Sequence, residues 1–185
     1  INDLAEDKNG KIWVATANGL NRFDPITKQW ITFYARGQDS STFLLNPNVW
    51  SCYVDGNNEV WMAPDGRGLS VYSNRTQKLR HYPWRKLVNA LLPQYYNRYC
   101  SVIKIVARNE NEFWLGTTLG LFSFNKLSGK YTLIGTGYYG DFIDLAYDQQ
   151  NRKVYLTAAQ EKLFCYDERL NEYKQLQPSQ LSYPS

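Results

Sequence analysis

The chain has little of what catalytic and metal sites are built from. Its 185 residues include a single histidine, His81, a single methionine and three cysteines. A Ser–His–Asp arrangement needs an oriented base, and nothing in the sequence marks one. No cluster of His, Cys and carboxylates has metal-ligand spacing, and there is no Gly-rich phosphate-binding loop followed by Lys. We therefore expect no catalytic residue, no cofactor and no metal in this chain.

The chain also has no large excess of positive or negative charge and no long apolar run. The net charge is +4, and Lys and Arg are scattered without a run of five or more. This pattern does not indicate a nucleic-acid partner. No stretch of about 18 apolar residues could span a bilayer, so we expect membrane contact only through a longer parent chain. No signal peptide is visible, and the chain opens within a repeat, so we expect a piece of a larger protein.

What the chain does contain is aromatic residues and a repeated phrase. Aromatics make up 16% of the residues against 21% charged, a composition typical of β-rich binding proteins. The phrase occurs in four copies, at 1–34, 49–82, 102–134 and 142–176. Each copy has one anchor aromatic in register: Trp13, Trp61, Trp114 and Tyr155. A period of roughly 40–50 residues is typical of stacked supersecondary units, and the fixed register predicts that the tryptophans are core.

Each copy consists of four short β-type runs separated by turn residues. In the first copy the runs are 1–6, 11–16, 20–23 and 30–34. The turns between them are rich in Asp, Asn, Gly and Pro, as in hairpins. A four-stranded meander cannot bury both faces alone, whereas blades arranged radially bury their faces on one another. The repeats therefore predict an all-β fold of four four-stranded antiparallel β-propeller blades within one segment, 1–185.

The repeat register also interprets one cysteine. Cys52 falls where the other copies have Leu4, Ile105 and Leu145, so we expect a small buried hydrophobe there. A Cys52–Cys100 disulfide stays an open alternative, because spacing alone does not give connectivity.

The phrase resembles the two-component regulator propeller repeat, D-x-x-G-x-(I/L)-W-(V/I)-(A/G)-T-x-x-G-L-x-x-(F/Y)-(D/N). Copy one matches nearly throughout, from Asp7 to Asp24. Copy two keeps the anchor Trp but departs from the pattern after it, and copy three keeps most of the pattern but has Arg108 for the turn Asp. Copy four is the most divergent, with Tyr155 for Trp. The resemblance covers nearly the whole chain.

In that family the repeats form blades of seven-bladed propellers in the periplasmic sensor half of hybrid histidine kinases, notably in gut bacteria that sense glycan breakdown products. The resemblance implies a periplasmic sensor segment of an inner-membrane two-component receptor that responds to oligosaccharides. It also implies an open partial propeller cut from a larger ring, while the alternative that the four copies close as a four-bladed ring stays open. Exposed terminal blades should then self-associate, as a homodimer or through blade faces.

Propeller geometry places the second-to-third turns and the connections between blades on one face. The connections 35–48, 83–101 and 135–141 are long or variable, and such loops commonly carry binding. They and the turn at 65–68 contain aromatic, Arg and Asp side chains that suit sugar rings and hydroxyls. The candidate ligand residues are Arg36, Asp65, Arg67, Trp84, Tyr95, Tyr96, Arg98, Tyr99, Tyr138, Tyr139 and Asp141.

Other interpretations stay open. Residue by residue, the tyrosines and the segment 90–93 could close a short helical turn over the blades, and an Arg there could pack its stem. The whole segment could be a platform for dimerisation and signal relay that binds no ligand. A lyase-like propeller enzyme is a third alternative, but the axial His and Glu of such enzymes have no counterpart that we can place here.

Overall fold

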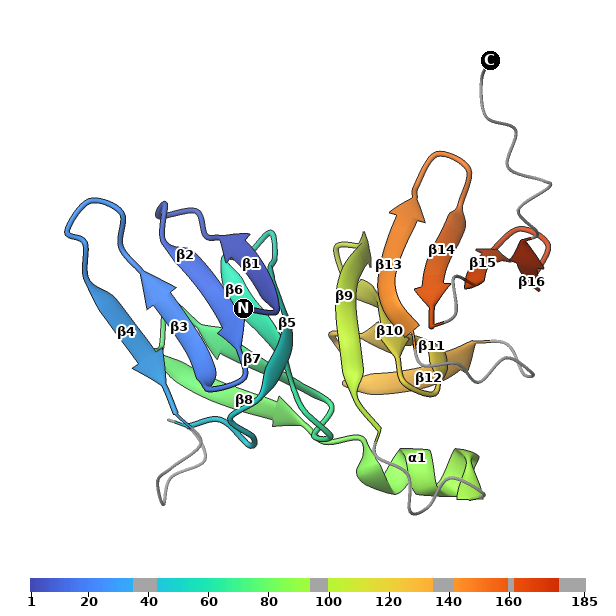
Figure 1. Ribbon diagram of the computed structural model, residues 1–185, viewed down its shortest axis with the longest axis horizontal. Helices are drawn as coiled ribbons and strands as arrows, with labels where there is room; N and C mark the ends of the chain where they lie inside the picture. Colours follow the sequence, from blue (N-terminus) through green and yellow to red (C-terminus); the bar gives the residue numbers. More distant parts are fainter. Residues whose placement is uncertain (35–42, 94–99, 135–141, 160–161, 177–185) are drawn as a thin grey trace.

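The computed structural model describes residues 1–34, 43–93, 100–134, 142–159 and 162–176 (Figure 1). The described residues form four antiparallel sheets, one from each repeat, with the strands in sequence order. The first sheet contains β1 (Asp3–Glu6), β2 (Ile12–Thr16), β3 (Gly19–Phe23) and β4 (Trp30–Phe33). The second contains β5 (Val49–Val54), β6 (Glu59–Pro64), β7 (Leu69–Ser73) and β8 (Lys78–Tyr82). The third contains β9 (Val102–Asn109), β10 (Glu112–Thr117), β11 (Gly120–Asn125) and β12 (Lys130–Ile134). The fourth contains β13 (Phe142–Asp148), β14 (Lys153–Ala158), β15 (Lys162–Asp167) and β16 (Glu172–Leu176), and a short helix, α1 (Arg85–Leu91), follows the second sheet.

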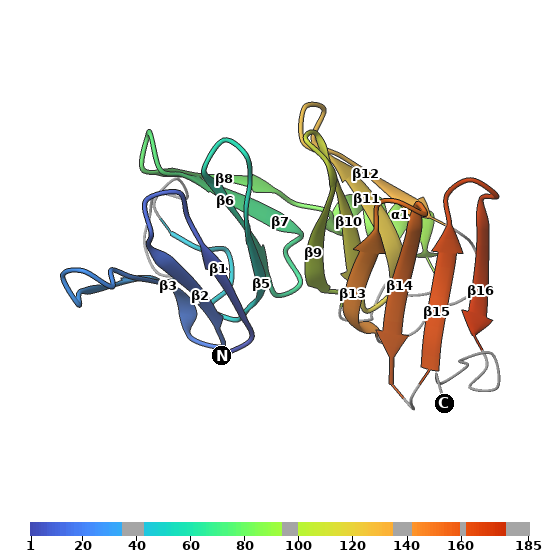
Figure 2. The same ribbon diagram turned by 90° about the horizontal axis from the view of Figure 1, so that it is seen from above.

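The sheets are the blades of a partial propeller, as predicted. The innermost strands β1, β5, β9 and β13 contact one another in that order, and Figure 2 shows the sheets fanning out from them. Three apolar clusters join the first blade to the second, the second to the third, and the third to the fourth. Among the described residues no such cluster joins the fourth blade to the first. The blades therefore form an open arc.

One anchor tryptophan fills each interface between blades. Trp13, Trp61 and Trp114 are fully or almost fully buried, which confirms that they are core. Each ring contacts an aromatic ring of the following blade: Trp13 meets Tyr72 at 5.4 Å, Trp61 meets Phe113 at 5.0 Å and Trp114 meets Tyr166 at 5.8 Å between centroids. Truncating such a ring to Ala typically costs about 3–5 kcal/mol. The stack of blades depends on these contacts.

The turn Asp of the repeat holds the anchor ring in place. Asp7 Oδ2 accepts a hydrogen bond from the Trp13 indole N–H at 2.8 Å, and Asp55 Oδ2 accepts one from Trp61 at 3.0 Å. The other oxygen of each carboxylate accepts two backbone N–H groups of its own turn. One side chain thus shapes the first turn and fixes the indole.

The third blade has Arg108 in place of this Asp and holds its anchor tryptophan by a different contact. The guanidinium lies 4.6 Å from the centre of the Trp114 ring, a cation–π contact. In the part of the chain that the structure describes, the Trp114 indole nitrogen has no hydrogen-bond partner. Arg108 therefore contacts the face of the Trp114 ring, whereas the turn Asp of the other blades binds the N–H at the edge of the indole.

The side chain at this repeat position also forms an ion pair with the following blade. It is the anion of the pair in the second blade and the cation in the third. Asp55 binds Lys126 of the third blade at 2.9 Å, and Arg108 binds Glu168 of the fourth at 2.7 Å. Burial raises the pKa of Asp55, but bonds from Lys126 and Trp61 outweigh it and leave the pKa below its ordinary value. Placing the fourth blade directly on the second would set Glu168 against Asp55. The pairs therefore disfavour direct packing of the fourth blade on the second.

The three cysteines form no disulfide with one another, so the alternative of a Cys52–Cys100 disulfide is wrong. Cys52 lies in the cluster between the first two blades, as its repeat register predicts. Burial raises the pKa of its thiol to about 12. No helix among the described residues is long and apolar enough to cross a membrane.

Substituting Lys126→Glu should test the ion pairs. The new carboxylate would face Asp55, which is 3% exposed, without a counter-charge. We expect the free energy of unfolding to fall by about 3–5 kcal/mol, measured by urea denaturation. Lys130→Glu is the matched control, because Lys130 is an exposed lysine of the same blade and should change stability by less than about 0.5 kcal/mol. Equal losses in the two variants would contradict a specific role for the pair.

The glycine just before the third strand of the second blade should be irreplaceable. Gly68 has φ +84°, and a Cβ there would lie 2.5 Å from the Tyr82 carbonyl oxygen. We expect Gly68→Ala to lower the free energy of unfolding by about 2 kcal/mol or more. Gly56, in the first turn of the same blade, has open space around its Cβ position, and Gly56→Ala should be close to neutral. Thermal unfolding of both variants would show the difference; a stable Gly68→Ala protein would refute it.

Candidate functional site

The second-to-third turns and the described parts of the connections between blades lie on one face of the arc, and three predicted ligand residues lie there. Figure 1 shows α1 at the lower edge of the sheets and the first-to-second turns at the upper edge. Of the predicted ligand residues, Asp65, Arg67 and Trp84 are among the described residues. The others lie outside them: Arg36, Tyr95, Tyr96, Arg98, Tyr99, Tyr138, Tyr139 and Asp141.

Trp84 does not belong to an exposed binding surface. Its side chain is 0% exposed, and its ring packs against Phe122 at 5.5 Å and Tyr131 at 5.8 Å between centroids. The residue lies immediately before α1 and anchors the helix against the third blade. The prediction of Trp84 as a ligand residue is corrected here: the surrounding aromatics exclude a ligand from its ring.

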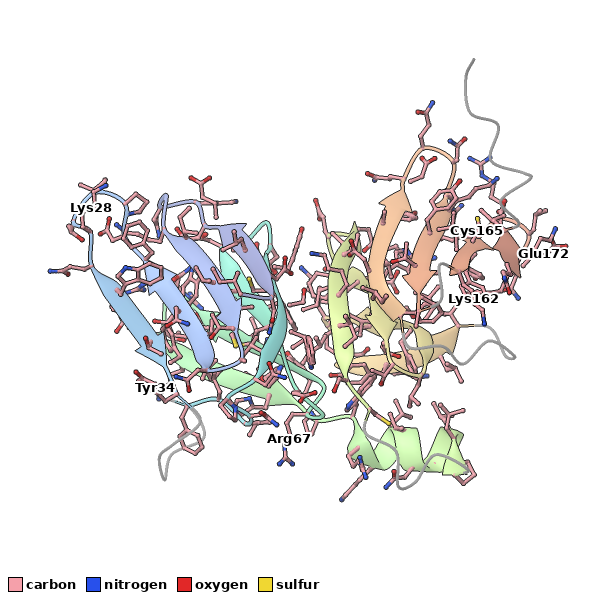
Figure 3. All side chains as sticks on the ribbon, viewed as in Figure 1. Lys28, Tyr34, Arg67, Lys162, Cys165 and Glu172 are labelled. Atoms are coloured by element: carbon pink, nitrogen blue, oxygen red, sulfur yellow. The ribbon has the colours of Figure 1, made fainter. Side chains whose placement is uncertain are left out.

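Asp65 and Arg67 line a cavity of about 570 Å³ between the second blade and the start of α1. The cavity is also lined by Leu45, Gly66, Pro83 and Arg85. Figure 3 shows Arg67 projecting from the edge of the second blade on the side of α1. Asp65 and Arg67 therefore do come together, with a second guanidinium that the sequence analysis did not single out.

The carboxylate of Asp65 is held by three donors from two segments, the start of β5 and the residue before β9. Its Oδ1 accepts hydrogen bonds from the Trp50 indole at 2.8 Å and from the Ser101 hydroxyl, and its Oδ2 accepts one from Asn48 at 3.3 Å. The Asp65 backbone N–H donates to the Asn48 carbonyl at 2.8 Å. Ser101 Oγ also accepts the N–H of Gly66 at 3.0 Å. This network fixes the turn that carries Arg67 before any ligand arrives.

A second cavity, of about 520 Å³, lies where the inner strands of all four blades begin. Its walls combine an indole, an amide, a cation and a carboxylate with apolar side chains. The lining residues are Ile1, Asn2, Trp50, Ile103, Lys104, Phe142, Ile143 and Asp144. Trp50 belongs to this wall while its indole N–H bonds Asp65, which lines the first cavity. We call the second cavity the axial cavity and the first the Arg67 cavity.

Sequence reasoning missed the residues of the axial cavity. Strand pairing places Asn2, Trp50, Ile103 and Ile143 at one repeat position, and Asp3, Ser51, Lys104 and Asp144 at the next. The pattern that could have revealed them is variation in residue type at a position where the fold is constant. The sequence analysis considered only turns and connections, and these residues lie at the strand starts.

Asp3 ties three blades together beside the axial cavity. Its carboxylate accepts a hydrogen bond from Ser51 Oγ at 2.7 Å and one from the Cys52 N–H at 3.2 Å, both in the second blade. Lys104 of the third blade reaches it at 2.9 Å. Charged groups at the axis are thereby fixed in position. Among the described residues no cluster of His, Cys, Asp and Glu could hold a metal ion.

Comparison with known proteins addresses the repeat directly. The family model described as "Two component regulator propeller" matches residues 1–18. The match covers the first-to-second strand hairpin of the first blade. The resemblance inferred from copy one is confirmed by this match, which spans the turn Asp and the anchor Trp13 of the first blade. No curated protein matches the sequence.

Solved structures share the fold of this chain. The extracellular domain assigned to the hybrid two component system BT3049 from B. thetaiotaomicron has 22% identity and a TM-score of 0.74, covering 95% of this chain and 24% of that one. The domain assigned to the one component system BT4673 from the same organism has 18% identity and a TM-score of 0.75, covering 96% and 22%. The Mitotic Checkpoint Complex contains a similar chain at 13% identity and a TM-score of 0.63. At these identities the likeness shows the fold, and the chain spans about a quarter of the first two structures.

Removing the Asp65 carboxylate should loosen the site. Asp65→Ala leaves the Trp50 indole and the Ser101 hydroxyl without their acceptor, and we expect the free energy of unfolding to fall by about 2–3 kcal/mol. Asp65→Asn retains an acceptor oxygen and should cost less than half of that. Urea denaturation measures both. If the two variants are equally stable, the hydrogen bonds do not hold this turn.

Proposed function

We propose that the chain is the ligand-recognition segment of an extracytoplasmic sensor in a two-component signalling receptor, and that its ligand is an oligosaccharide. The parent is a hybrid histidine kinase of the inner membrane, with this segment in the periplasm. The axial cavity carries the proposal. It lies where four blades meet, so one bound molecule would contact all of them and could bias their arrangement.

The chemistry of the cavity walls supports a sugar ligand. A sugar ring presents apolar CH groups on its faces and hydroxyls around its edge. Trp50 offers an aromatic surface, while Asn2, Lys104 and Asp144 offer donors and acceptors for hydroxyls. The repeat match and the extracellular origin of the similar structures support the sensor role and the location. We propose recognition without catalysis, because these wall residues suggest binding and orientation of a molecule but no nucleophile activated by a base.

The exposed face of the first blade favours a second candidate function, a platform for self-association. Leu4 and Trp30 are each 58% exposed. Their counterparts in the second blade, Cys52 and Leu79, are only 5% and 6% exposed because the preceding blade covers them. An uncovered apolar face of this kind can pair with another chain. In that role the segment would relay a signal as a homodimer and bind no ligand.

A thermal-shift panel of oligosaccharides tests the first proposal. A ligand present at about 100 times its dissociation constant should raise the melting temperature by about 5–10 °C. Asp144→Ala should reduce the shift, because Asp144 lines the axial cavity. Asp148→Ala, at the other end of the same strand β13 and in the first turn, should leave the shift unchanged.

The same experiment separates the two candidates. No shift with any oligosaccharide, together with dimerisation at micromolar concentration in light scattering, would reject the sensor proposal in favour of the platform. A shift that survives Asp144→Ala but disappears in Asp148→Ala would place the ligand on the wrong face and would also reject the proposed site.

A further inference from the structure

We propose that the Arg67 cavity selects oligosaccharides that carry an anionic group, a carboxylate or a sulfate ester, and that Arg67 and Arg85 bind this group. The inference rests on the proposed function and adds the charge of the ligand to it. Two guanidinium groups and a single carboxylate line a cavity of about 570 Å³. That volume lies within the usual range of ligand pockets.

The single carboxylate of the cavity is already engaged by the protein. Asp65 accepts hydrogen bonds from Trp50, Ser101 and Asn48, so its oxygens are directed into the framework between the blades. Its role is to hold the turn that carries Arg67. Cations outnumber anions around the cavity, and the excess positive charge is what an incoming anion would meet.

The guanidinium of Arg67 is exposed and forms no ion pair or side-chain hydrogen bond with the residues that the structure describes. Its backbone is nevertheless fixed. The Arg67 N–H donates to the Pro64 carbonyl at 3.0 Å, and Gly66 is bound to Ser101. Gly68 follows with φ +84° and fits tightly against the Tyr82 carbonyl. A rigid turn therefore presents a guanidinium to solvent at the mouth of the cavity.

Arg85 lies across the same cavity on an equally firm base. It is the first residue of α1 and follows Trp84, which is completely buried. Two guanidinium groups on separate elements suit a planar, multivalent anion, because each can donate two parallel N–H bonds to carboxylate or sulfate oxygens. Leu45 and Pro83 supply apolar wall for the sugar ring that bears the anion.

One hydrogen bond connects a wall residue of the Arg67 cavity with a wall residue of the axial cavity. Trp50 lines the axial cavity, Asp65 lines the Arg67 cavity, and the two side chains are joined at 2.8 Å. An oligosaccharide in the axial cavity could therefore extend its charged residue toward Arg67. The axial cavity would bind the chain of sugars, and the Arg67 cavity would discriminate its charge.

Titration calorimetry with three matched probes tests this inference: oligogalacturonate for carboxylate, a sulfated chondroitin oligosaccharide for sulfate ester, and a neutral galactose oligosaccharide of equal length. At least one acidic probe should bind about tenfold or more tightly than the neutral one, and its affinity should fall with added salt. Arg67→Ala should remove most of that preference. Arg67→Lys should restore part of it, since the charge remains but the fork of donors is lost.

Arg75→Ala is the matched control. Arg75 is an exposed arginine of the same blade, in the third turn on the opposite face, so its removal lowers the net charge equally and should leave the preference intact. Neutral and acidic probes binding equally well would overturn the inference and leave the sensor proposal standing. If neither the three probes nor any oligosaccharide of the thermal-shift panel binds, both the inference and the sensor proposal are rejected. Equal losses in the Arg67 and Arg75 variants would show a general charge effect and overturn the site, as would inorganic sulfate binding as tightly as the acidic probe.

Discussion

The structure depends on burying one large aromatic ring in each interface between blades. Two β-sheets packed at an angle leave a space that widens away from the axis, and the anchor tryptophans fill it. An indole in such a place must keep one orientation, and the repeat provides this through the turn Asp in two blades and Arg108 in the third. Turn shape, ring position and blade packing are thus set by a few residues within each copy. The side chains around the two cavities are positioned by this arrangement.

Some repeat positions serve the packing of the blades, and others line the axial cavity. Positions that contact neighbouring blades repeat their residue types, whereas positions at the strand starts differ from blade to blade. Asn2, Trp50 and Ile103 occupy one repeat position and yet have unrelated chemistry. Because the side chains that the blades contribute to this cavity are not restricted to one residue type, they can change without any change in the packing of the blades. The Asp3 carboxylate shows that the axis is also structural, since it joins three blades through Ser51, Cys52 and Lys104.

The repeats made the fold predictable, and their absence elsewhere made the site hard to predict. Four copies in phase specify strands, turns and core tryptophans, because each copy corroborates the others. Trp84 lies in a connection that no other copy shares, so its composition suggested an exposed aromatic, while the structure has it beneath α1. Trp50 lies within a strand and was passed over, although its register places it at the axial cavity. Arg67 could be predicted because a second-to-third turn has a defined place in the blade. Arg85 depends on where α1 packs, which local sequence does not reveal.

The alternating ion pairs have a consequence for how such a protein can change its length. Tandem repeats are commonly thought to grow and shrink by recombination of whole units, since neighbouring units look interchangeable. Here Asp55 and Arg108 occupy the same position with opposite charges, and so do Lys126 and Glu168. Losing the third unit by recombination would join two acids, and inserting an extra copy of it would join two bases. Loss or duplication of the third unit alone is therefore disfavoured by the charges at these two junctions.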